Sequence, residues 1–170
     1  LAKVLYGARQ ARWDMLKAIS LLASKLTCLT IGCDKALHRL MCYIDSTCDL
    51  VLRGWAGDDA ATLELMLYAD ADFAGDRPLM KSTTGGFIAL HGEHTMFPLS
   101  AKSKRQTSTS HSTPEAEIVA ADDVARTMGI PSLDMWACLQ GRSLDVTLDE
   151  DSRYCLQIIK SGRNPTMRHI

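Results

Sequence analysis

The segment LELMLYADADFAGD, residues 63–76, constrains the fold more than any other part of the chain because its side chains alternate in character. Every second position is apolar: Leu63, Leu65, Leu67, Ala69, Ala71 and Phe73. A period of two with one apolar face is typical of a strand that is buried on one side only. The following run, AGDRP, breaks the pattern, so we expect the strand to end near Phe73.

The opposite face of this strand carries two carboxylates at its end, Asp70 and Asp72. Aspartate is a poor strand former, so two of them at this place need a reason. One reason is a divalent cation, which prefers carboxylate oxygens as ligands. The other interpretation is a polar strand end that runs into a turn, and the segment alone fits both.

Composition and charge narrow the class of protein only slightly. The 170 residues suit one domain, or one domain with a helical extension, and 46% of them are hydrophobic, which is enough for a core. The net charge of −1 does not indicate a nucleic-acid partner, so any such binding must come from local clusters. The sequence has neither an apolar run of membrane-spanning length nor a secretory leader, and we expect an intracellular piece of a longer polypeptide.

The six cysteines do not form a recognisable metal-binding pattern. Four of them fall in the first fifty residues with His38 among them, but the chain has no Cys-x-x-Cys and the spacings match no common zinc motif. We interpret them as reduced thiols of an intracellular protein.

The parts before and after the alternating segment differ in periodicity. Apolar residues recur at spacings of three and four over residues 4–26, which predicts one long helix, and Asp34 is a candidate N-cap for a second. Residues 49–55 fit a short strand. After the alternating segment, short connections between predicted strands favour an antiparallel meander, with Pro98 at an irregular or edge position. These strands cover residues 85–90 and 95–100, and a later strand covers residues 144–148.

Residues 101–112, AKSKRQTSTSHS, hold the densest basic cluster of the chain: Lys102, Lys104 and Arg105. Their polar character predicts a loop. Such a loop either lies in solvent or contacts the phosphates of a nucleic acid, and the residues alone favour neither.

A helix is expected to begin at Ser112, because Ser112-Thr113-Pro114-Glu115 has the form of a capping box with proline early in the helix. We expect it to end at Gly129, and a second helix to cover residues 131–140 before Gly141. Glu117 lies at the edge of the apolar stripe, where it could point at a neighbouring strand end. First-turn acids favoured by the helix dipole are the alternative interpretation.

Carboxylates therefore follow several element ends: Asp70 with Asp72, Glu117, and Asp151 after the last strand, where Ser152 can cap a final helix. Converging carboxylates would repel one another, and some would stay protonated. Divalent metal ions remove that objection, and two Mg²⁺ ions can support phosphodiester hydrolysis.

Several blocks of the chain resemble, in the same order, the ribonuclease H region of copia-type retrotransposon polyproteins. They are YADADFAGD at 68–76, KSTTGGF at 81–87, SKRQ at 103–106, EAEIVA at 115–120, Asp151-Ser152 and the closing RHI at 168–170. The earlier helices, with YGAR at 6–9 and LHRL at 37–40, resemble the end of the preceding reverse-transcriptase region. The blocks are specific as a set, and the resemblance covers nearly the whole chain.

The resemblance implies an α/β fold of the ribonuclease H type, with a mixed five-stranded sheet flanked by helices and its C-terminal part missing. It implies two segments: a helical segment over residues 1–55 and a ribonuclease H-like domain over residues 56–170. The implied activity is cleavage of the RNA strand of RNA–DNA hybrids during reverse transcription, with two Mg²⁺ or Mn²⁺ ions. The implied partners are the hybrid and the adjoining reverse-transcriptase region of the same polyprotein, and no membrane is implied. The implied location is the cytoplasm or the nucleus, including virus-like particles.

The resemblance also implies roles for single residues. Asp70 would bridge the metals, Glu117 would hold one of them and position water, and Asp151 would bind the other. Asp72 is the alternative ligand on the same strand face, and Glu115 is the alternative to Glu117. The nucleic-acid backbone would be contacted by the following residues: Lys102, Lys104, Arg105, Ser82 and Thr83.

The chain departs from the family pattern at three places. Ala101 and Ile118 stand where the family often has aromatic residues, and a fourth carboxylate, usual late in ribonuclease H domains, would lie beyond Ile170. Two other hypotheses therefore stay open: an inactive retroelement remnant that at most binds nucleic acid, and a structural adaptor. The adaptor predicts that Asp70, Glu117 and Asp151 lie apart.

Overall fold

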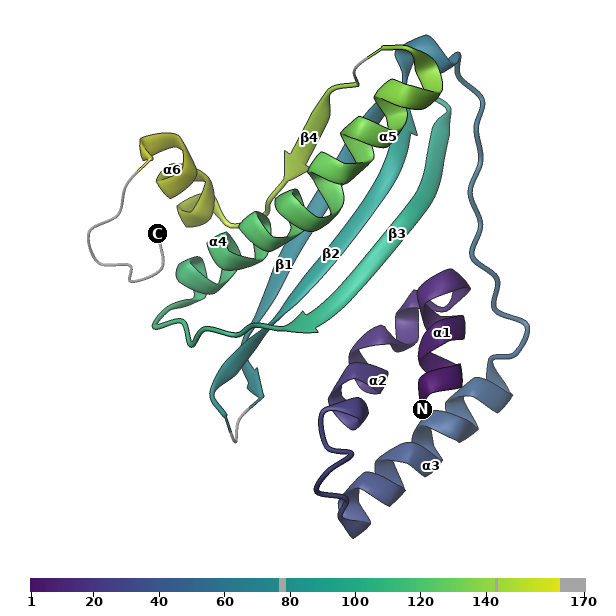
Figure 1. Ribbon diagram of the computed structural model, residues 1–170, viewed down its shortest axis with the longest axis vertical. Coiled ribbons are helices and arrows are strands. Elements are labelled where there is room, and N and C mark those ends of the chain that lie inside the picture. The colour runs from purple at the N-terminus through teal and green to yellow at the C-terminus, as the bar shows by residue number, and fades with distance from the viewer. Residues whose placement is uncertain (77–78, 143, 163–170) are drawn as a thin grey trace. The chain divides into compact units, whose positions relative to one another are not determined.

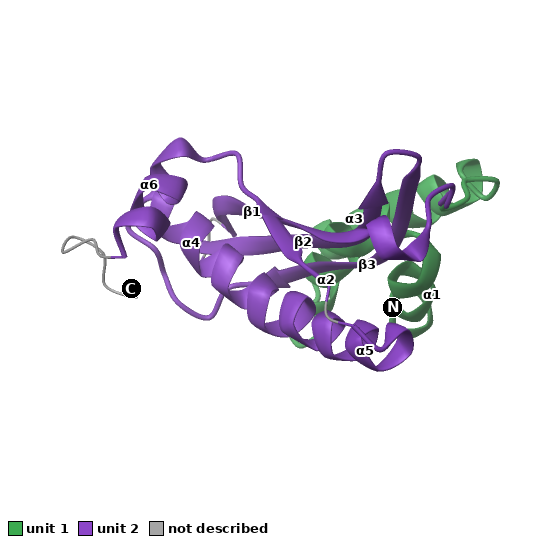
Figure 2. Cartoon of the chain, turned by 90° about the horizontal axis from the view of Figure 1, so that it is seen from above, with its two compact units in different colours: residues 1–52 green, residues 53–170 purple. Residues whose placement is uncertain are grey.

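The structure, a computed structural model, describes residues 1–76, 79–142 and 144–162. The chain divides into two compact units, Leu1–Leu52 and Arg53–Ile170 (Figure 2). Among the described residues, none of the helices is long and apolar enough to cross a membrane.

Unit 1 (residues 1–52) is helical. Its elements are α1 (Ala2–Ala11), a 3₁₀ turn (Trp13–Met15), α2 (Leu16–Ala23) and α3 (Ile31–Ser46). The prediction of one long helix over residues 4–26 is wrong, because the backbone leaves the helical region at Arg12 (φ −124°, ψ 62°). The break lets the Arg12 guanidinium bind the Asp14 carboxylate and the carbonyl of Thr47, which joins the ends of α1 and α3.

The start of α3 also differs from the prediction. Thr30 is the N-cap, since its hydroxyl accepts the backbone N–H of Cys33 at 3.3 Å, and Asp34 lies inside the first turn. Thr30 is four residues earlier and already satisfies a free N–H of the helix end, so the aspartate is not needed as a cap. The strand predicted over residues 49–55 is likewise wrong except for one bridge, between Trp55 and Met96.

Unit 2 (residues 53–170) is built on a mixed sheet with the order β3-β2-β1-β4 (Figure 1). The strands are β1 (Glu64–Asp76), β2 (Lys81–Gly92), β3 (Thr95–Arg105) and β4 (Val146–Asp149). β1, β2 and β3 form the predicted antiparallel meander, and β4 pairs with β1 in parallel. The α/β class with helices flanking a mixed sheet is confirmed, but the described residues form four strands rather than the five expected.

The alternating segment forms the predicted half-buried strand, but the expected end near Phe73 is wrong: after a register shift β1 continues to Asp76, which pairs with Lys81. Leu65, Leu67, Ala69 and Ala71 are all buried on one face of β1. That face is covered by α4 (Thr113–Val124), which continues through a π-helical turn (Ala125–Gly129) into α5 (Ile130–Gln140), as Figure 1 shows. The helix and sheet approach closely at Gly86, where an added Cβ would lie 2.7 Å from the Val124 side chain.

The basic cluster is not in a loop. β3 continues to Arg105, where it pairs with Thr83 of β2, so Lys102, Lys104 and Arg105 lie on an edge strand. The loop prediction fails because an edge strand keeps polar side chains in solvent and so lacks an apolar alternation. The edge position expected from Pro98 is confirmed, and the β2–β3 register shifts beside it, where Ile88 pairs with Ser100 and Ala89 with Pro98.

The capping signals of this unit are confirmed, but the prediction that a helix ends at Gly129 is wrong, because Gly129 keeps a helical backbone (φ −63°, ψ −63°) and α4 continues through it into α5. The hydroxyl of Ser112 accepts the Glu115 N–H at the start of α4, and that of Ser152 accepts the Cys155 N–H at the start of α6 (Arg153–Ser161). Gly141 and Gly162 end α5 and α6 at φ of 67° and 69°, a left-handed conformation that suits glycine.

Candidate functional site

The pairing of β1 with β4 brings two of the predicted acids to the same end of the sheet, toward which these two strands run. Tyr68 pairs with Asp149 in the parallel ladder, and Asp70 and Asp151 each follow two residues later. Because parallel neighbours run side by side in the same direction, both carboxylates emerge at the same end of the sheet. Asp70 and Asp151 are exposed. We call this end of the sheet the carboxylate edge, formed by Asp70, Glu117, Glu150 and Asp151.

The second turn of α4 adds Glu117 to the carboxylate edge. Small side chains let the helix approach β1 closely, because Ala116 and Ala120 pack against Ala71. The Glu117 carboxylate accepts the backbone N–H of Ala71, the residue after Asp70. The Glu117 side chain is only 6% exposed, so α4 presents a buried carboxylate directly beside the end of β1.

The electrostatics of Glu117 show that these acids are near one another. Its pKa is raised to about 7, first by burial, then by repulsion from Glu150 and Asp70, with Asp151 contributing less; the Ala71 N–H opposes the rise. Charges that shift the pKa of one group in this way lie close to it. Asp70, Glu117 and Asp151 therefore belong to one electrostatic cluster, although they come from three separate elements.

Glu150 is the member of this cluster that the sequence analysis did not single out. It is 6% exposed, and its Oε1 accepts the Ser152 N–H at 3.1 Å. Burial is the main cause that raises its pKa, and Cys155, which is fully buried against it, has a pKa raised to about 12. A signal was present, because Glu150 shares the period-two face of Leu144 and Leu148, which lies toward the core.

Two oxygens at the carboxylate edge are left without a partner. Within the described residues, Glu117 Oε2 and Glu150 Oε2 are fully buried and make no hydrogen bond. A buried carboxylate oxygen is unfavourable unless a proton, a hydrogen-bond donor or a cation satisfies it. An all-carboxylate donor set suits hard divalent cations such as Mg²⁺ and Mn²⁺.

The side chains as they stand do not form a finished metal site. The described residues contain no group of three or more histidine, cysteine, aspartate or glutamate side chains arranged to hold one ion. Glu117 and Glu150 are fixed by burial, whereas Asp70 and Asp151 are exposed and can change rotamer. The residues thus fit a divalent ion by their chemistry and by the unpartnered oxygens of Glu117 and Glu150.

The two alternative ligands have different surroundings. The Asp72 carboxylate lies over the backbone of Gly75, where an added Cβ would come within 2.1 Å of Asp72 Oδ2. Glu115 is 1% exposed, and its Oε2 accepts the His111 N–H at 2.6 Å. Asp72 thus lies against the turn after β1, and Glu115 stabilises the start of α4.

The predicted nucleic-acid contacts divide by exposure. Lys102 binds Asp123 and Thr127 of the helix, and Arg105 donates to Asp76 at 2.9 Å. Lys104 is exposed and makes no ion pair within the described part of the chain. Ser82 and Thr83 are buried, and Ser82 Oγ accepts the Ala74 N–H at 3.1 Å, so neither side chain is exposed for a backbone contact.

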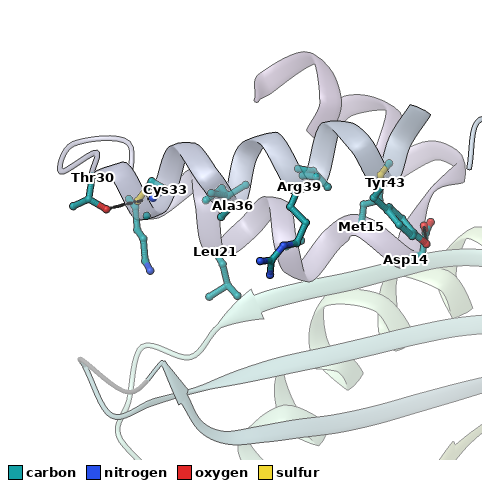
Figure 3. A pocket seen from close by; sticks show the side chains of 13 residues that line it. Asp14, Met15, Leu21, Thr30, Cys33, Ala36, Arg39 and Tyr43 are labelled. Carbon is teal, nitrogen blue, oxygen red and sulfur yellow. Dashed lines mark hydrogen bonds between the residues drawn. The ribbon is translucent and has the colours of Figure 1, made fainter. Parts of the chain in front are cut away.

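Unit 1 contains a cleft of about 640 Å³ between α2 and α3 (Figure 3). Its lining is mostly apolar, with Leu21 from α2 and Ala36 from α3 among the side chains in the picture. Its acid, Asp14, is held by hydrogen bonds of 2.9 Å from Arg12 and from Tyr43. The cleft therefore has the character of a packing surface rather than of a reaction centre.

Comparison with protein-family models, with curated proteins and with solved structures finds no match to this chain. The functional argument accordingly depends on the residues of the carboxylate edge and on the sequence blocks that carry the family resemblance.

Proposed function

We propose that unit 2 is a ribonuclease H-type nuclease of a copia-type retrotransposon polyprotein, which cleaves the RNA strand of RNA–DNA hybrids. The observation that carries the proposal is the electrostatic cluster of Asp70, Glu117 and Asp151. These are the three acids that the sequence resemblance implies, and Asp70 and Asp151 both raise the pKa of Glu117. A structural adaptor would have no reason to gather acids from a strand, a helix and a strand end around buried, unpartnered oxygens.

The carboxylate edge supports the proposal because it offers carboxylate ligands of the kind that two-metal hydrolysis uses. Bound Mg²⁺ or Mn²⁺ ions would activate the attacking water and stabilise the leaving oxygen of the phosphodiester. Asp70, Glu117 and Asp151 would hold the ions, in the roles that the family resemblance implies: Asp70 for both ions, Glu117 for one and Asp151 for the other. The N–H of Ala71 fixes the Glu117 carboxylate beside β1, so the buried ligand is oriented before any ion arrives.

The exposed edge of β3 would contact the hybrid. Lys104 is available for a phosphate, while Lys102 and Arg105 are oriented by Asp123 and Asp76. Hybrid duplexes are recognised mostly through shape, phosphates and 2′-hydroxyls, so little sequence preference is expected. Unit 1 would then be the end of the reverse-transcriptase region, the partner within the same polyprotein.

A second candidate is an inactive remnant of such a nuclease that at most binds nucleic acid. One observation favours it: the described residues have no three-acid group already arranged around a single ion position. The two candidates share a fold and differ in whether metal completes the site.

The deciding experiment is cleavage of an end-labelled RNA–DNA hybrid by the whole chain with Mg²⁺ or Mn²⁺, compared with Asp70→Asn. The nuclease predicts cuts in the RNA strand only, reduced at least about 100-fold by the substitution. Asp149→Asn is the matched control, because it removes the same charge from an exposed residue of β4. Cleavage that Asp70→Asn leaves unchanged would refute the proposed site, and no cleavage by any variant would favour the remnant.

A further inference from the structure

Glu150 is placed and buried like a ligand, although the family resemblance gives it no role. It follows β4 directly and precedes Asp151, so it stands at the same end of the sheet as Asp70. Its side chain is 6% exposed, which is rare for a glutamate without a charged partner. A residue under no functional constraint at this position would be expected to be apolar or to turn toward solvent.

The local contacts of Glu150 satisfy only part of its carboxylate. Oε1 accepts the Ser152 N–H at 3.1 Å, which explains one oxygen as a support for the start of α6. Oε2 is buried and has no nitrogen or oxygen donor among the described residues, so the Cys155 thiol, a weak donor, is the side chain left to interact with the Glu150 carboxylate. No lysine or arginine of the described residues forms an ion pair with Glu150, so the side chains of that part of the chain do not neutralise it.

A second unpartnered oxygen lies in the same cluster. Glu117 Oε2 is also buried without a hydrogen bond, and Glu117 and Glu150 act on each other electrostatically. Two buried carboxylates that each keep one oxygen unpartnered, beside the exposed Asp70 and Asp151, present four acids around one end of the sheet. A divalent cation is a partner that both unpartnered oxygens could share, because such ions prefer carboxylate oxygens as ligands.

We propose that Glu150 is a further divalent-metal ligand of the carboxylate edge, which supplies through Oε2 the additional carboxylate that the site needs. This inference rests on the proposed function, since it assigns a ligand to the same site. It also removes the need for a fourth carboxylate from elsewhere in the chain. Glu150 would belong to the buried side of the site with Glu117, opposite the exposed aspartates.

The test is Mn²⁺ binding by the whole chain, counted by electron paramagnetic resonance of the free ion, with no nucleic acid present. Glu150→Gln keeps the size of the side chain and an oxygen for the Ser152 N–H but removes the charge. We expect its Mn²⁺ affinity to fall at least about 10-fold. Asp149→Asn, the same charge change one residue earlier on an exposed side chain, should bind like the unmodified chain.

Two further variants make the outcome unambiguous. Glu150→Asp keeps the charge but shortens the side chain by one methylene, so it should also bind Mn²⁺ weakly. Thermal melting in chelator verifies that each variant is folded. Glu150→Gln binding equal to the unmodified chain overturns the inference, while a loss in Asp70→Asn in the same series still supports the proposed site. An equal loss in Asp149→Asn and Glu150→Gln would reduce the effect to net charge and also overturn the inference, and an unmodified chain that binds no Mn²⁺ overturns both proposals.

Discussion

Asp14 in unit 1 and Glu117 in unit 2 are carboxylates with opposite surroundings: Asp14 is exposed and paired, whereas Glu117 is buried among other acids. Hydrogen bonds from Arg12 and Tyr43 hold the pKa of Asp14 below its ordinary value. Burial and three neighbouring acids raise the pKa of Glu117 to about 7. The folded chain thus satisfies the acid that joins its helices and leaves unsatisfied the acid at the end of its sheet.

This difference separates a structural carboxylate from one kept for a ligand. Asp14 needs nothing from outside, because Arg12 donates to it at 3.1 and 2.9 Å and Tyr43 at 2.9 Å. Glu117 has one backbone donor and a buried oxygen without any partner among the described residues. Unsatisfied buried acids reduce stability, so they are typical of functional sites.

The largest expected effect is a functional loss combined with a gain in stability. Glu117→Gln should reduce hybrid cleavage at least about 100-fold, because it removes a metal ligand. The same variant should be more stable than the unmodified chain in chelator at pH 8, by about 1–3 kcal/mol, because a buried charge is gone. Urea unfolding and the hybrid assay measure the two quantities. A Glu117 variant that loses both activity and metal-free stability would mean that the residue is structural, like Asp14.

The next effect is on the unfolding free energy, which should depend on pH with opposite sign in the two units. The folded pKa of Glu117, about 7, exceeds its ordinary value of 4.5, so the folded state binds more protons between these values. The unfolding free energy of metal-free unit 2 should therefore fall as pH rises from about 4.5 to 7, by up to about 3 kcal/mol. Urea unfolding in chelator across this range measures it, and Glu117→Gln should flatten the curve. A flat curve for the unmodified chain would contradict the raised pKa.

A smaller effect is expected in unit 1. The pKa of Asp14 is lowered on folding, so its contribution is present above its ordinary value of 3.8 and is lost as pH falls through the folded pKa. Asp14→Asn should destabilise α1–α3 by about 0.5–1 kcal/mol at pH 7 and remove this acid sensitivity. Hydrogen exchange of the amides in unit 1 measures it, with the exposed Asp45→Asn as control. Equal exchange in the two variants would refute the role given to the Arg12–Asp14 pair.

The smallest effect concerns the basic residues of β3. Lys104→Ala should weaken binding of the hybrid and reduce the salt dependence of that binding by about one ion, because it removes a phosphate contact. Lys102→Ala should change the affinity less, since Lys102 already binds Asp123 and Thr127. Titration of labelled hybrid at several salt concentrations measures both. A larger loss of hybrid affinity for Lys102→Ala than for Lys104→Ala would mean that Lys102, not Lys104, is the main phosphate contact.

Local patterns predicted the elements that depend on neighbouring residues. The alternation at 63–76 gave β1 and the face that carries Asp70, and serines 112 and 152 gave the starts of α4 and α6. The register that brings Asp70 level with Asp151 comes from the parallel pairing of β1 with β4, which no short pattern encodes. The sequence therefore indicated the acids, and tertiary pairing determines that they are neighbours.

The predictions that the structure contradicts share a cause. The helix break at Arg12 depends on Thr47, which is distant in sequence, and the extension of β3 to Arg105 depends on pairing with β2. The burial of Glu150 follows the apolar face of β4 rather than the preference of glutamate for solvent. Each is a case in which long-range contacts override local preference.

Thermal melting of the whole chain at pH 7.5, with and without 10 mM Mg²⁺, shows whether the carboxylate edge holds a divalent metal. For a dissociation constant of about 1 mM, binding would add about 1.4 kcal/mol, a rise of roughly 4 °C in the midpoint of unit 2. The account predicts this rise for the unmodified chain and none for Asp70→Asn. No rise in the unmodified chain, or the same rise in Asp70→Asn, would contradict it.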